Sequence, residues 1–478
     1  MQESMAQSQR PVARVGLIFA LVIVAYFLDV IDFSIVQVAL PSITATFHSA
    51  LADTQWVISA YALTIAGFLL LMGRAGDIYG QKKIFVAGLV LFTIASFSGG
   101  IAPSLLVLVI FRAIQGIGAA MTTVTAFAIF IALFPEGPER NRAFGILIAV
   151  LSGGFAAGSV AGGVLTTFLG WRSVMFVNVP IGIGAAIACQ RILPGLESKR
   201  TDYHLDVAGA LTVTTGTSLV VYGLTNGATP GIGFTSLETI IPLVISAMVL
   251  VAFLAIESKS KSPLLPLGFL RRGSVLTGNA LALVFTSIIG GVSVIMTYYL
   301  QNVLGYSPLY AGLGILPAAL IFLIVGGWGA AKVVDRFGVR RVLIASAIMV
   351  SAGVALLTTI STQSSFISIV PGLIVWAFGA SIGFPAVNIA AIAGTQHGEE
   401  GLASGVVNTS FRIGFPLGLA VLLTVADAFD PPTAPAATGL VAGFQYALVA
   451  GSLLGLLGLA IAFKIKDVKP TDWKSHAM

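Results

Sequence analysis

Charged side chains are scarce in this sequence: Asp, Glu, Lys and Arg together make up 9% of its 478 residues. An average soluble domain carries about 25% charged residues, so this chain has too few to cover the surface of a soluble protein. Hydrophobic residues make up 57% of the chain, and its mean hydropathy is +1.00. This composition indicates an integral membrane protein that lies in contact with a lipid bilayer.

Cysteine and histidine are also rare. The single cysteine, Cys189, lies in an apolar run, which excludes a disulfide framework and a thiolate metal site. The four histidines lie in or near predicted loops, and no Ser/His/Asp, HExxH, GxGxxG or P-loop arrangement occurs at a plausible place. We therefore expect no metal, no cofactor and no enzyme activity.

The formal net charge is +6, yet the basic residues lie in short loops between apolar runs and form no single patch. This pattern argues against a nucleic-acid partner. It indicates topology instead, because positively charged loops stay in the cytoplasm. With the N-terminus inside, most Lys and Arg residues fall in cytoplasmic segments, and both ends of the chain are predicted to be cytoplasmic.

Long apolar runs occupy most of the chain. A bilayer core about 30 Å thick is crossed by a helix of about 20 apolar residues, and the sequence divides into fourteen such runs. The predicted fold is therefore all-α, with fourteen transmembrane helices. The predicted spans are 15–40, 55–72, 84–102, 104–133, 143–168, 174–193, 206–226, 238–256, 275–300, 308–330, 342–360, 366–394, 402–427 and 438–463.

One short segment occurs twice, as GRAGDIYGQKK at 73–83 and as AKVVDRFGVRR at 331–341. Repeats of this kind are typical of membrane proteins built from two related bundles, as many secondary transporters are. The first copy joins spans 2 and 3 and the second joins spans 10 and 11, so two helices are inserted between two halves of six. The predicted domains are an N-terminal bundle (1–195), an inserted two-helix linker (196–270), a C-terminal bundle (271–465) and a cytoplasmic tail (466–478).

Two carboxylates stand in the first apolar run. Asp29 and Asp32 are three residues apart, so they share one helix face, about one turn from each other. An ionisable group in hydrocarbon is costly and marks a functional site by default. Because two desolvated carboxylates this close do not both ionise readily, we expect at least one to bind and release a proton. The alternative is a structural ion pair that holds helices together.

Arg112, in the fourth run, is the natural partner of these carboxylates. From the rise of a helix, Arg112 lies about 12 Å from the outer end of its span, and the two Asp residues lie about 10–15 Å from theirs. A guanidinium keeps its charge, so it stabilises a nearby carboxylate and releases it when the carboxylate is neutralised. Gln115, one turn further on, would complete the polar cluster. A purely structural anchor in span 4 is the alternative.

Further motifs accompany these residues. They are LDVIDFSIVQVALP at 28–41, RAIQGIGAA at 112–120, GSVAGGVL at 158–165 and WRSVMFVNVPIG at 171–182. Together with the loop at 73–83, they resemble the motifs of the fourteen-span drug:proton antiporter family of the major facilitator superfamily, and the resemblance covers nearly the whole chain. Asp32 matches the family's motif position, whereas Asp29 does not.

The resemblance implies the major facilitator fold with six, two and six helices. It also implies multidrug efflux driven by the proton motive force, with protons and a small-molecule substrate as partners and a role for Arg112 in proton transfer. The expected place is the inner (plasma) membrane of a bacterium, and the protein is expected to act as a monomer.

Polar and aromatic residues in several runs are candidates for the lining of a central cavity. Arg412 lies near mid-membrane by helix rise, where a buried cation pairs either with a substrate acid or with an Asp across the cavity. Single aromatic residues in spans are more often packing or interface residues, which is the alternative for several of the others. The candidate substrate-binding residues are Gln37, Trp56, Tyr61, Gln115, Tyr298, Gln301, Asn388, Asn408 and Arg412.

The two repeated loops are predicted to form a conformational latch. Inside-positive charge alone, which is the alternative, needs the basic residues of these loops but not their Asp and Gly residues. Asp77 and Asp335 would each accept hydrogen bonds from a helix N-terminus or a basic residue when the cytoplasmic side closes. The candidate latch residues are Gly73, Asp77, Gly80, Lys82, Asp335, Arg336, Gly338 and Arg340.

Glycines recur in the fifth run, at Gly154, Gly158, Gly162 and Gly163. They allow helices to approach closely. Helix packing explains most of them. The functional alternative is a dry hinge against the opposite bundle, which limits leak while the bundles move.

These observations favour a proton-coupled antiporter that exports small amphiphilic compounds, cationic or zwitterionic, by alternating access. The alternative keeps the fold and changes the cargo: a dedicated exporter of one metabolite, antibiotic or lipid-like organic acid, with Arg412 as the anion contact. A membrane enzyme or a non-transporting receptor is the least favoured class.

Overall fold

The computed structural model describes residues 12–134, 138–194, 205–228, 232–260, 267–270, 273–392, 400–429 and 436–465. Helices make up almost all of these residues, and the described ranges contain no strand. The predicted all-α fold is therefore confirmed. The predicted cytoplasmic tail, 466–478, lies outside the described residues.

The N-terminal bundle consists of α2 to α9. Its first helix continues through Pro41 to Phe47, beyond the predicted end at residue 40. Proline is tolerated inside membrane helices because neighbouring groups satisfy the backbone that it frees. The elements are α2 (Val12–Phe47), α3 (Leu51–Thr54), α4 (Trp56–Tyr79), α5 (Gln81–Gly100), α6 (Leu105–Leu133), α7 (Pro138–Leu169), α8 (Arg172–Phe176) and α9 (Asn178–Ile192).

Two helices precede the C-terminal bundle, α10 (Val207–Ala228) and α11 (Leu237–Lys259), and their insertion between two halves of six stays a prediction. Two helices of the C-terminal bundle contain π-helical segments, which sequence patterns do not reveal and which often mark functional sites. The elements are α12 (Leu267–Leu270), α13 (Gly273–Tyr298), η1 (Tyr299–Val303), α14 (Pro308–Ile321), η2 (Phe322–Gly329), α15 (Ala330–Phe337), α16 (Val339–Leu357), α17 (Phe366–Ile392), α18 (Glu400–Ala428) and α19 (Ala436–Ala462).

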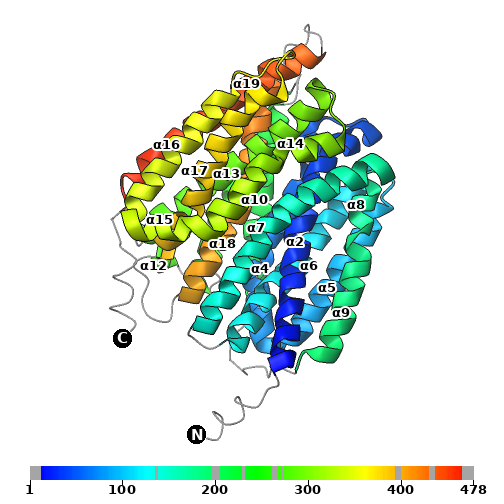
Figure 1. Cartoon of the computed structure of the whole chain (residues 1–478), viewed down its shortest axis with the longest axis vertical. Coiled ribbons are helices and arrows are strands. Elements are labelled where there is room, and N and C mark those ends of the chain that lie inside the picture. The colour runs from blue at the N-terminus through cyan, green and yellow to red at the C-terminus, as the bar shows by residue number, and fades with distance from the viewer. Residues whose placement is uncertain are drawn as a thin grey trace, which may run out of the picture.

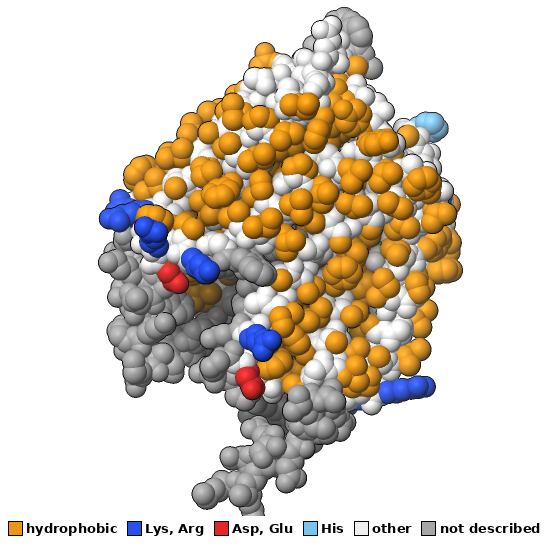
Figure 2. All heavy atoms as spheres, viewed as in Figure 1, with side chains coloured by type: hydrophobic (Ala, Val, Ile, Leu, Met, Phe, Trp, Pro, Cys, Tyr) orange, Lys and Arg blue, Asp and Glu red, His pale blue; other side chains and the backbone are white. Residues whose placement is uncertain are grey.

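Thirteen helices in the described part of the chain are long and apolar enough to cross a membrane, and a shorter apolar helix, Gly153–Leu169, forms part of α7. The count of fourteen spans and the cytoplasmic position of both ends stay predictions. Figure 2 shows hydrophobic side chains spread over most of the visible face, with the charged side chains gathered toward one edge. Such a surface suits contact with lipid.

The repeated loops share one backbone conformation. Gly80 joins α4 to α5 with φ 99° and ψ 131°, and Gly338 joins α15 to α16 with φ 83° and ψ 155°. Positive φ is accessible to glycine because it lacks a Cβ atom. Two loops alike in sequence thus make the same sharp turn between helices, as a duplicated unit would.

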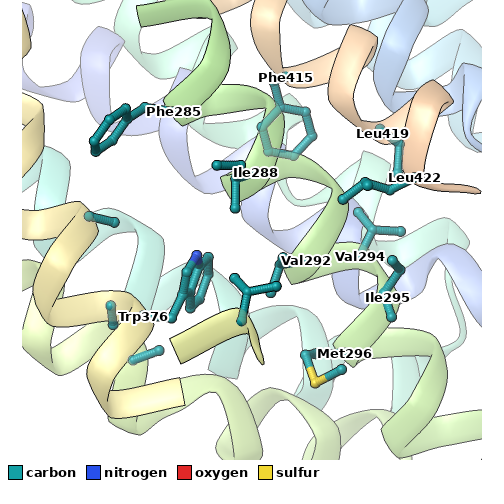
Figure 3. Packing of buried hydrophobic residues seen from close by; sticks show 14 of the residues in the cluster. Phe285, Ile288, Val292, Val294, Ile295, Met296, Trp376, Phe415, Leu419 and Leu422 are labelled. Atoms are coloured by element: carbon teal, nitrogen blue, oxygen red, sulfur yellow. The ribbon is translucent and has the colours of Figure 1, made fainter. Parts of the chain in front are cut away.

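The two bundles lie side by side (Figure 1). Within the N-terminal bundle, α2 packs on α6, α7 and α9, and within the C-terminal bundle α13 packs on α17, α18 and α19. Figure 3 shows part of that second core, with Ile288 and Val292 of α13 near Trp376 of α17 and Phe415 of α18. The bundles meet along two seams, α4 against α18 and α7 against α14.

Helix α10 contacts both bundles at the seam between α4 and α18. Gln55 Nε2 donates a hydrogen bond of 2.8 Å to Thr225 Oγ1 of α10, and Thr424 Oγ1 of α18 donates one of 3.0 Å to the Leu224 carbonyl of α10. A cavity of about 80 Å³ beside α10 is far below the size of ligand sites, about 300–1,000 Å³. Its lining residues are Leu63, Thr217, Val220, Val221, Ile413 and Leu417.

Candidate functional site

A fully buried ion pair lies inside the N-terminal bundle. Arg112 Nη1 of α6 lies 2.6 Å from Asp32 Oδ2 of α2, and both side chains are 0% exposed. Arg112 also donates from Nε to the Val57 carbonyl at 2.9 Å. Removing one member of a buried pair costs about 3–5 kcal/mol because the other charge is left without compensation. The predicted proximity of these two residues is therefore present in the structure.

Two amide side chains add hydrogen bonds to this pair, although Arg112 Nη2 has no partner among the described residues. Gln115 Nε2 donates to Asp32 Oδ1 at 2.9 Å, and Gln115 Oε1 accepts from Arg112 Nη1 at 2.8 Å. Asn178, the first residue of α9, donates from Nδ2 to Asp32 Oδ1 at 2.7 Å and to Ser96 Oγ at 3.2 Å. The Asp32 carboxylate thus accepts hydrogen bonds from three side chains, all within one bundle.

A second ion pair crosses between the bundles. Arg412 of α18 binds Asp29 of α2, with Nη2 bonded to Oδ2 and Nη1 at 3.4 Å from Oδ1. The Arg412 side chain is 27% exposed and that of Asp29 is 3% exposed. The sequence left open whether Arg412 meets a substrate acid or an Asp across the cavity, and in this conformation it meets Asp29.

Tyr61 of α4 lies between the two ion pairs. Its hydroxyl donates a hydrogen bond of 2.6 Å to Asp29 Oδ1, and the Arg112 guanidinium carbon lies 4.2 Å from its ring centroid. A desolvated cation over an aromatic ring is stabilised by about 2 kcal/mol. Since Tyr61 contacts one member of each pair, a change at either pair alters the surroundings of the other.

Contacts between the bundles continue from the Asp29–Arg412 pair toward the C-terminal end of α2. Phe33 and Phe415 meet edge to face with ring centroids 4.6 Å apart, and their positions are one turn beyond Asp29 and Arg412. Near the end of α2, the hydroxyls of Thr44 and Tyr298 are hydrogen-bonded at 2.9 Å. These contacts close the space between the bundles on that side of the ion pair.

Two more hydrogen bonds join the bundles near the same end. Gln301 Nε2 of η1 donates to the Val38 carbonyl of α2 at 2.9 Å. The Leu309 amide of α14 donates to Thr167 Oγ1 of α7 at 3.0 Å. Tyr298 and Gln301, both predicted to contact substrate, are thus engaged in closing contacts between the bundles in this conformation.

The other predicted substrate residues are dispersed. Gln37 is buried, and its carbonyl oxygen has no hydrogen-bond partner among the described residues. Trp56 faces Tyr222 of α10, with ring centroids 6.5 Å apart. Asn388 donates to the Phe384 carbonyl within α17 at 3.0 Å. Asn408 is exposed on α18, one turn before Arg412.

The first latch loop binds its own bundle. Gln81 Nε2 donates to Asp77 Oδ1 at 2.9 Å. Lys82 Nζ donates to the carbonyls of Gln190 and Leu193, at 2.8 and 2.6 Å, at the C-terminal end of α9. A cation at that end satisfies carbonyls that have no partner within the helix. Gly73 lies in α4, where an added Cβ would be 3.1 Å from Val124 Cγ2 of α6.

In the second loop, Asp335, Arg336 and Arg340 are exposed, and the Arg336 guanidinium lies 5.4 Å from the ring centroid of Phe337. Gly338 makes the turn that Gly80 makes in the first loop. The latch itself stays a prediction.

The glycines of α7 face two different helices. A Cβ atom on Gly154 would be 3.2 Å from Val30 Cγ1, and one on Gly162 would be 2.8 Å from the Ile35 carbonyl oxygen, both on α2. Gly158 lies against Ser34 of the same helix. Gly163 faces the other bundle instead, where a Cβ would be 2.7 Å from the Pro308 carbonyl oxygen. The motif thus packs α7 on α2 along most of its length and on α14 at one end.

Sequence reasoning did not single out Asn178, Ser96, Phe33 or Phe415. Asn178 lies within the WRSVMFVNVPIG motif, but an amide in an apolar motif gives no sign of the carboxylate that it binds. A close look for polar residues inside apolar spans would have included Asn178 and Ser96. Among the described residues, no group of three or more His, Cys, Asp or Glu side chains is placed to hold a metal ion.

Comparison with known proteins gives consistent matches. The family profile described as Major Facilitator Superfamily matches residues 22–419 and 331–477. The chain is 37% identical to the cephamycin export protein CmcT of Amycolatopsis lactamdurans, over 84% of this chain and 83% of that protein. It is 34% identical to the puromycin resistance protein pur8 of Streptomyces alboniger, over 93% of this chain and 90% of that protein.

A third relative is the multidrug resistance protein Stp of Mycobacterium tuberculosis, 33% identical over 84% of this chain and 74% of that protein. Among solved structures, the human organic anion transporter MFSD10 has a similar fold, with a TM-score of 0.63 at 14% identity. That match covers 95% of this chain and 100% of the other.

Proposed function

Because the chain belongs to the major facilitator superfamily, we propose that this multi-pass membrane transporter exports small amphiphilic compounds in exchange for protons by alternating access. Relatives named for antibiotic export, antibiotic resistance and multidrug resistance support the exporter role. Proton coupling is supported by the chemistry of the site, and the proton motive force would be the energy source.

The observation that carries the proposal is the placement of two ion pairs around Tyr61. One pair, Asp32–Arg112, lies within a bundle, and the other, Asp29–Arg412, crosses between bundles. A bundle interface that opens at this level must separate Asp29 from Arg412. Since a separated buried charge is costly, the pair favours the conformation in which the bundles meet here.

Proton binding at a carboxylate of α2 would make the conformation in which the bundles meet less favourable. A proton on Asp29 removes its charge, so the attraction to Arg412 is lost and the bundles separate more readily. Tyr61 and Arg112 would pass the change on to Asp32, whose hydrogen-bond partners all lie in the same bundle. Loss of the proton on the other side of the membrane restores both pairs and resets the transporter.

The test is transport by the purified full chain in proteoliposomes with an imposed pH gradient and ethidium as an amphiphilic cation probe. Asp29→Asn and Asp32→Asn should each lower gradient-driven transport by about tenfold or more, because each variant removes one charge of a buried pair. Asp53→Asn, at an exposed carboxylate of α3, is the control and should keep wild-type rates. Gradient-driven transport retained by Asp32→Asn would contradict the scheme.

The second candidate function is the export of a single class of compound. The cephamycin export protein, 37% identical to this chain, is named for one class of antibiotic, which favours a dedicated exporter with the same mechanism. A panel of unrelated amphiphiles in the same proteoliposomes separates the two. Export of one compound class alone supports the dedicated exporter, and export of several supports the multidrug reading.

A further inference from the structure

The Asp29–Arg412 pair lies between the bundles and is not fully enclosed. Its arginine is 27% exposed, whereas both members of the Asp32–Arg112 pair are 0% exposed. One turn beyond the pair, Phe33 and Phe415 close the space between α2 and α18. A ligand at this position would therefore contact two opposite charges and an aromatic surface at once.

Few other ionisable groups lie near Asp29. On its own helix they are Tyr26 and Asp32, and the charge of Asp32 is balanced by Arg112. From other helices they are Tyr61 on α4 and Arg412 on α18, with Arg112 on the far side of the Tyr61 ring. The Tyr26 hydroxyl donates to the Thr123 carbonyl at 3.0 Å, and Tyr61 donates to Asp29 itself. Neither tyrosine brings a charge, so Arg412 alone balances Asp29 across the interface.

A proton on Asp29 has opposite effects on anionic and cationic ligands. It frees Arg412 for an anion, so that proton and anion bind together, which corresponds to transport of both in one direction. It also removes the carboxylate that a cation needs, so that proton and cation exclude each other, as exchange requires. Export driven by proton entry therefore calls for a cationic group at Asp29.

A cation alone would leave Arg412 without its partner. Breaking a buried pair by removing one member costs about 3–5 kcal/mol, less where water reaches the charge left behind. A ligand that carries both charges avoids this loss, because each half of the ion pair receives a new partner. The exchange then leaves the net charge of the site unchanged.

We propose that the preferred substrates are zwitterions that replace this ion pair, with an ammonium group bound to Asp29 and an acid group bound to Arg412. The apolar body of such a compound would pack against Phe33 and Phe415. This inference rests on the proposed proton-driven export and names the substrate class of the same site.

The test uses three forms of one scaffold: ampicillin, which is a zwitterion, its methyl ester, which is a cation, and its N-acetyl derivative, which is an anion. Uptake into proteoliposomes is driven by a pH gradient and corrected with protein-free liposomes, and ethidium is measured in parallel. Wild-type protein should transport ampicillin about tenfold faster than the ester, as a difference of about 1.4 kcal/mol in binding implies. The anion should be the slowest.

Arg412→Gln should reverse the order of the first two compounds, because it removes the partner of the acid group and leaves Asp29 free for the ester. Arg412→Lys keeps the charge and should keep the preference for the zwitterion, although weaker. Arg191→Gln, at the exposed last turn of α9, is the control and should leave the order unchanged. Each ratio comes from one preparation, so a partly unfolded variant lowers both rates and not their ratio.

The outcomes separate this inference from the proposed function. Wild-type transport of the ester at the rate of ampicillin, or an unchanged order in Arg412→Gln, would overturn the zwitterion proposal. Transport of ethidium with none of the three compounds would also overturn it. Absence of gradient-driven transport for all four probes would remove the proposed function and this inference with it.

Discussion

The hydroxyl of Tyr61 donates a 2.6 Å hydrogen bond to Asp29, and the ring that carries this hydroxyl lies under the guanidinium of Arg112. One side chain thus contacts both the ion pair inside the N-terminal bundle and the ion pair between the bundles. Substitutions at Tyr61 can separate these two contacts.

Tyr61→Phe removes the hydroxyl and keeps the ring. We expect the protein to fold and Arg112 to remain in place, while gradient-driven transport falls by about tenfold, because a hydrogen bond to a charged group contributes about 1.5–3 kcal/mol. Tyr61→Leu removes the ring as well and should also lower the melting temperature. Tyr222→Phe, at an exposed position on α10, is the control. Wild-type transport by Tyr61→Phe would show that the hydroxyl has no part in coupling.

Asn178→Ala removes one of the three side chains that donate to the Asp32 carboxylate. The free energy of unfolding should fall by about 1–3 kcal/mol, because a buried charge loses a donor that water cannot replace. Thermal unfolding of the purified protein in detergent measures this change. Asn226→Ala removes an exposed hydrogen bond to a carbonyl and should shift the midpoint far less. Equal shifts in the two variants would contradict the role of Asn178.

Gly162→Ala and Gly163→Ala should have different effects, although the two residues are neighbours: the first on the stability of the fold, the second on the interface between the bundles. The first places a Cβ 2.8 Å from the Ile35 carbonyl oxygen within one bundle and should destabilise the fold by about 1–3 kcal/mol, as overpacking does. The second meets Pro308 and Leu309 of the other bundle and should mainly weaken the closed interface between bundles.

Thermal unfolding tests the first glycine variant, and labelling of a cysteine placed at Tyr298 in a Cys189→Ala background tests the second. Gly145→Ala is the control in the same helix, since nothing lies within 4 Å of its Cβ position. Identical effects of the two variants on stability and labelling would contradict the assignment of Gly162 to packing within one bundle and of Gly163 to packing between the bundles.

A cross-link between Thr167→Cys and Leu309→Cys should stop transport. The Leu309 amide and the Thr167 hydroxyl are 3.0 Å apart across the α7–α14 seam, and alternating access requires this seam to open. Linking the two cysteines with a short bismaleimide, in a Cys189→Ala background, should lower transport by about tenfold or more while the fold survives. Each single-cysteine protein treated alike is the control. Full transport by the linked protein would exclude motion at this seam.

Much of the site follows from the scarcity of charge inside apolar segments. Asp29, Asp32 and Arg112 stand out because charged side chains are rare in spans, and Gln115 follows from its position one helical turn from Arg112. The structure brings all four together around Tyr61. The particular pairing, Asp32 with Arg112 and Asp29 with Arg412, depends on how the bundles pack and on nothing local to either segment.

Other features lie beyond sequence reasoning for the same reason. The latch predicted for Lys82 stays a prediction, but the binding of its ammonium group to the end of α9 could not be read from the repeated loop. Such a contact joins residues far apart in the chain. The predicted first span ends at residue 40, whereas α2 continues past Pro41 to Phe47. Proline inside a membrane helix makes its end hard to place from sequence, because neighbouring groups satisfy the backbone that proline frees.

Helix α10 makes the two seams between the bundles unequal. It is hydrogen-bonded to Gln55 of the N-terminal bundle and to Thr424 of the C-terminal bundle. Helix α10 therefore links the two bundles across the α4–α18 seam. No described helix links them in this way across the α7–α14 seam. Any rotation of one bundle relative to the other must strain or break the hydrogen bonds that α10 makes across the α4–α18 seam. We therefore expect the bundles to separate asymmetrically, with the wider gap beside α7 and α14.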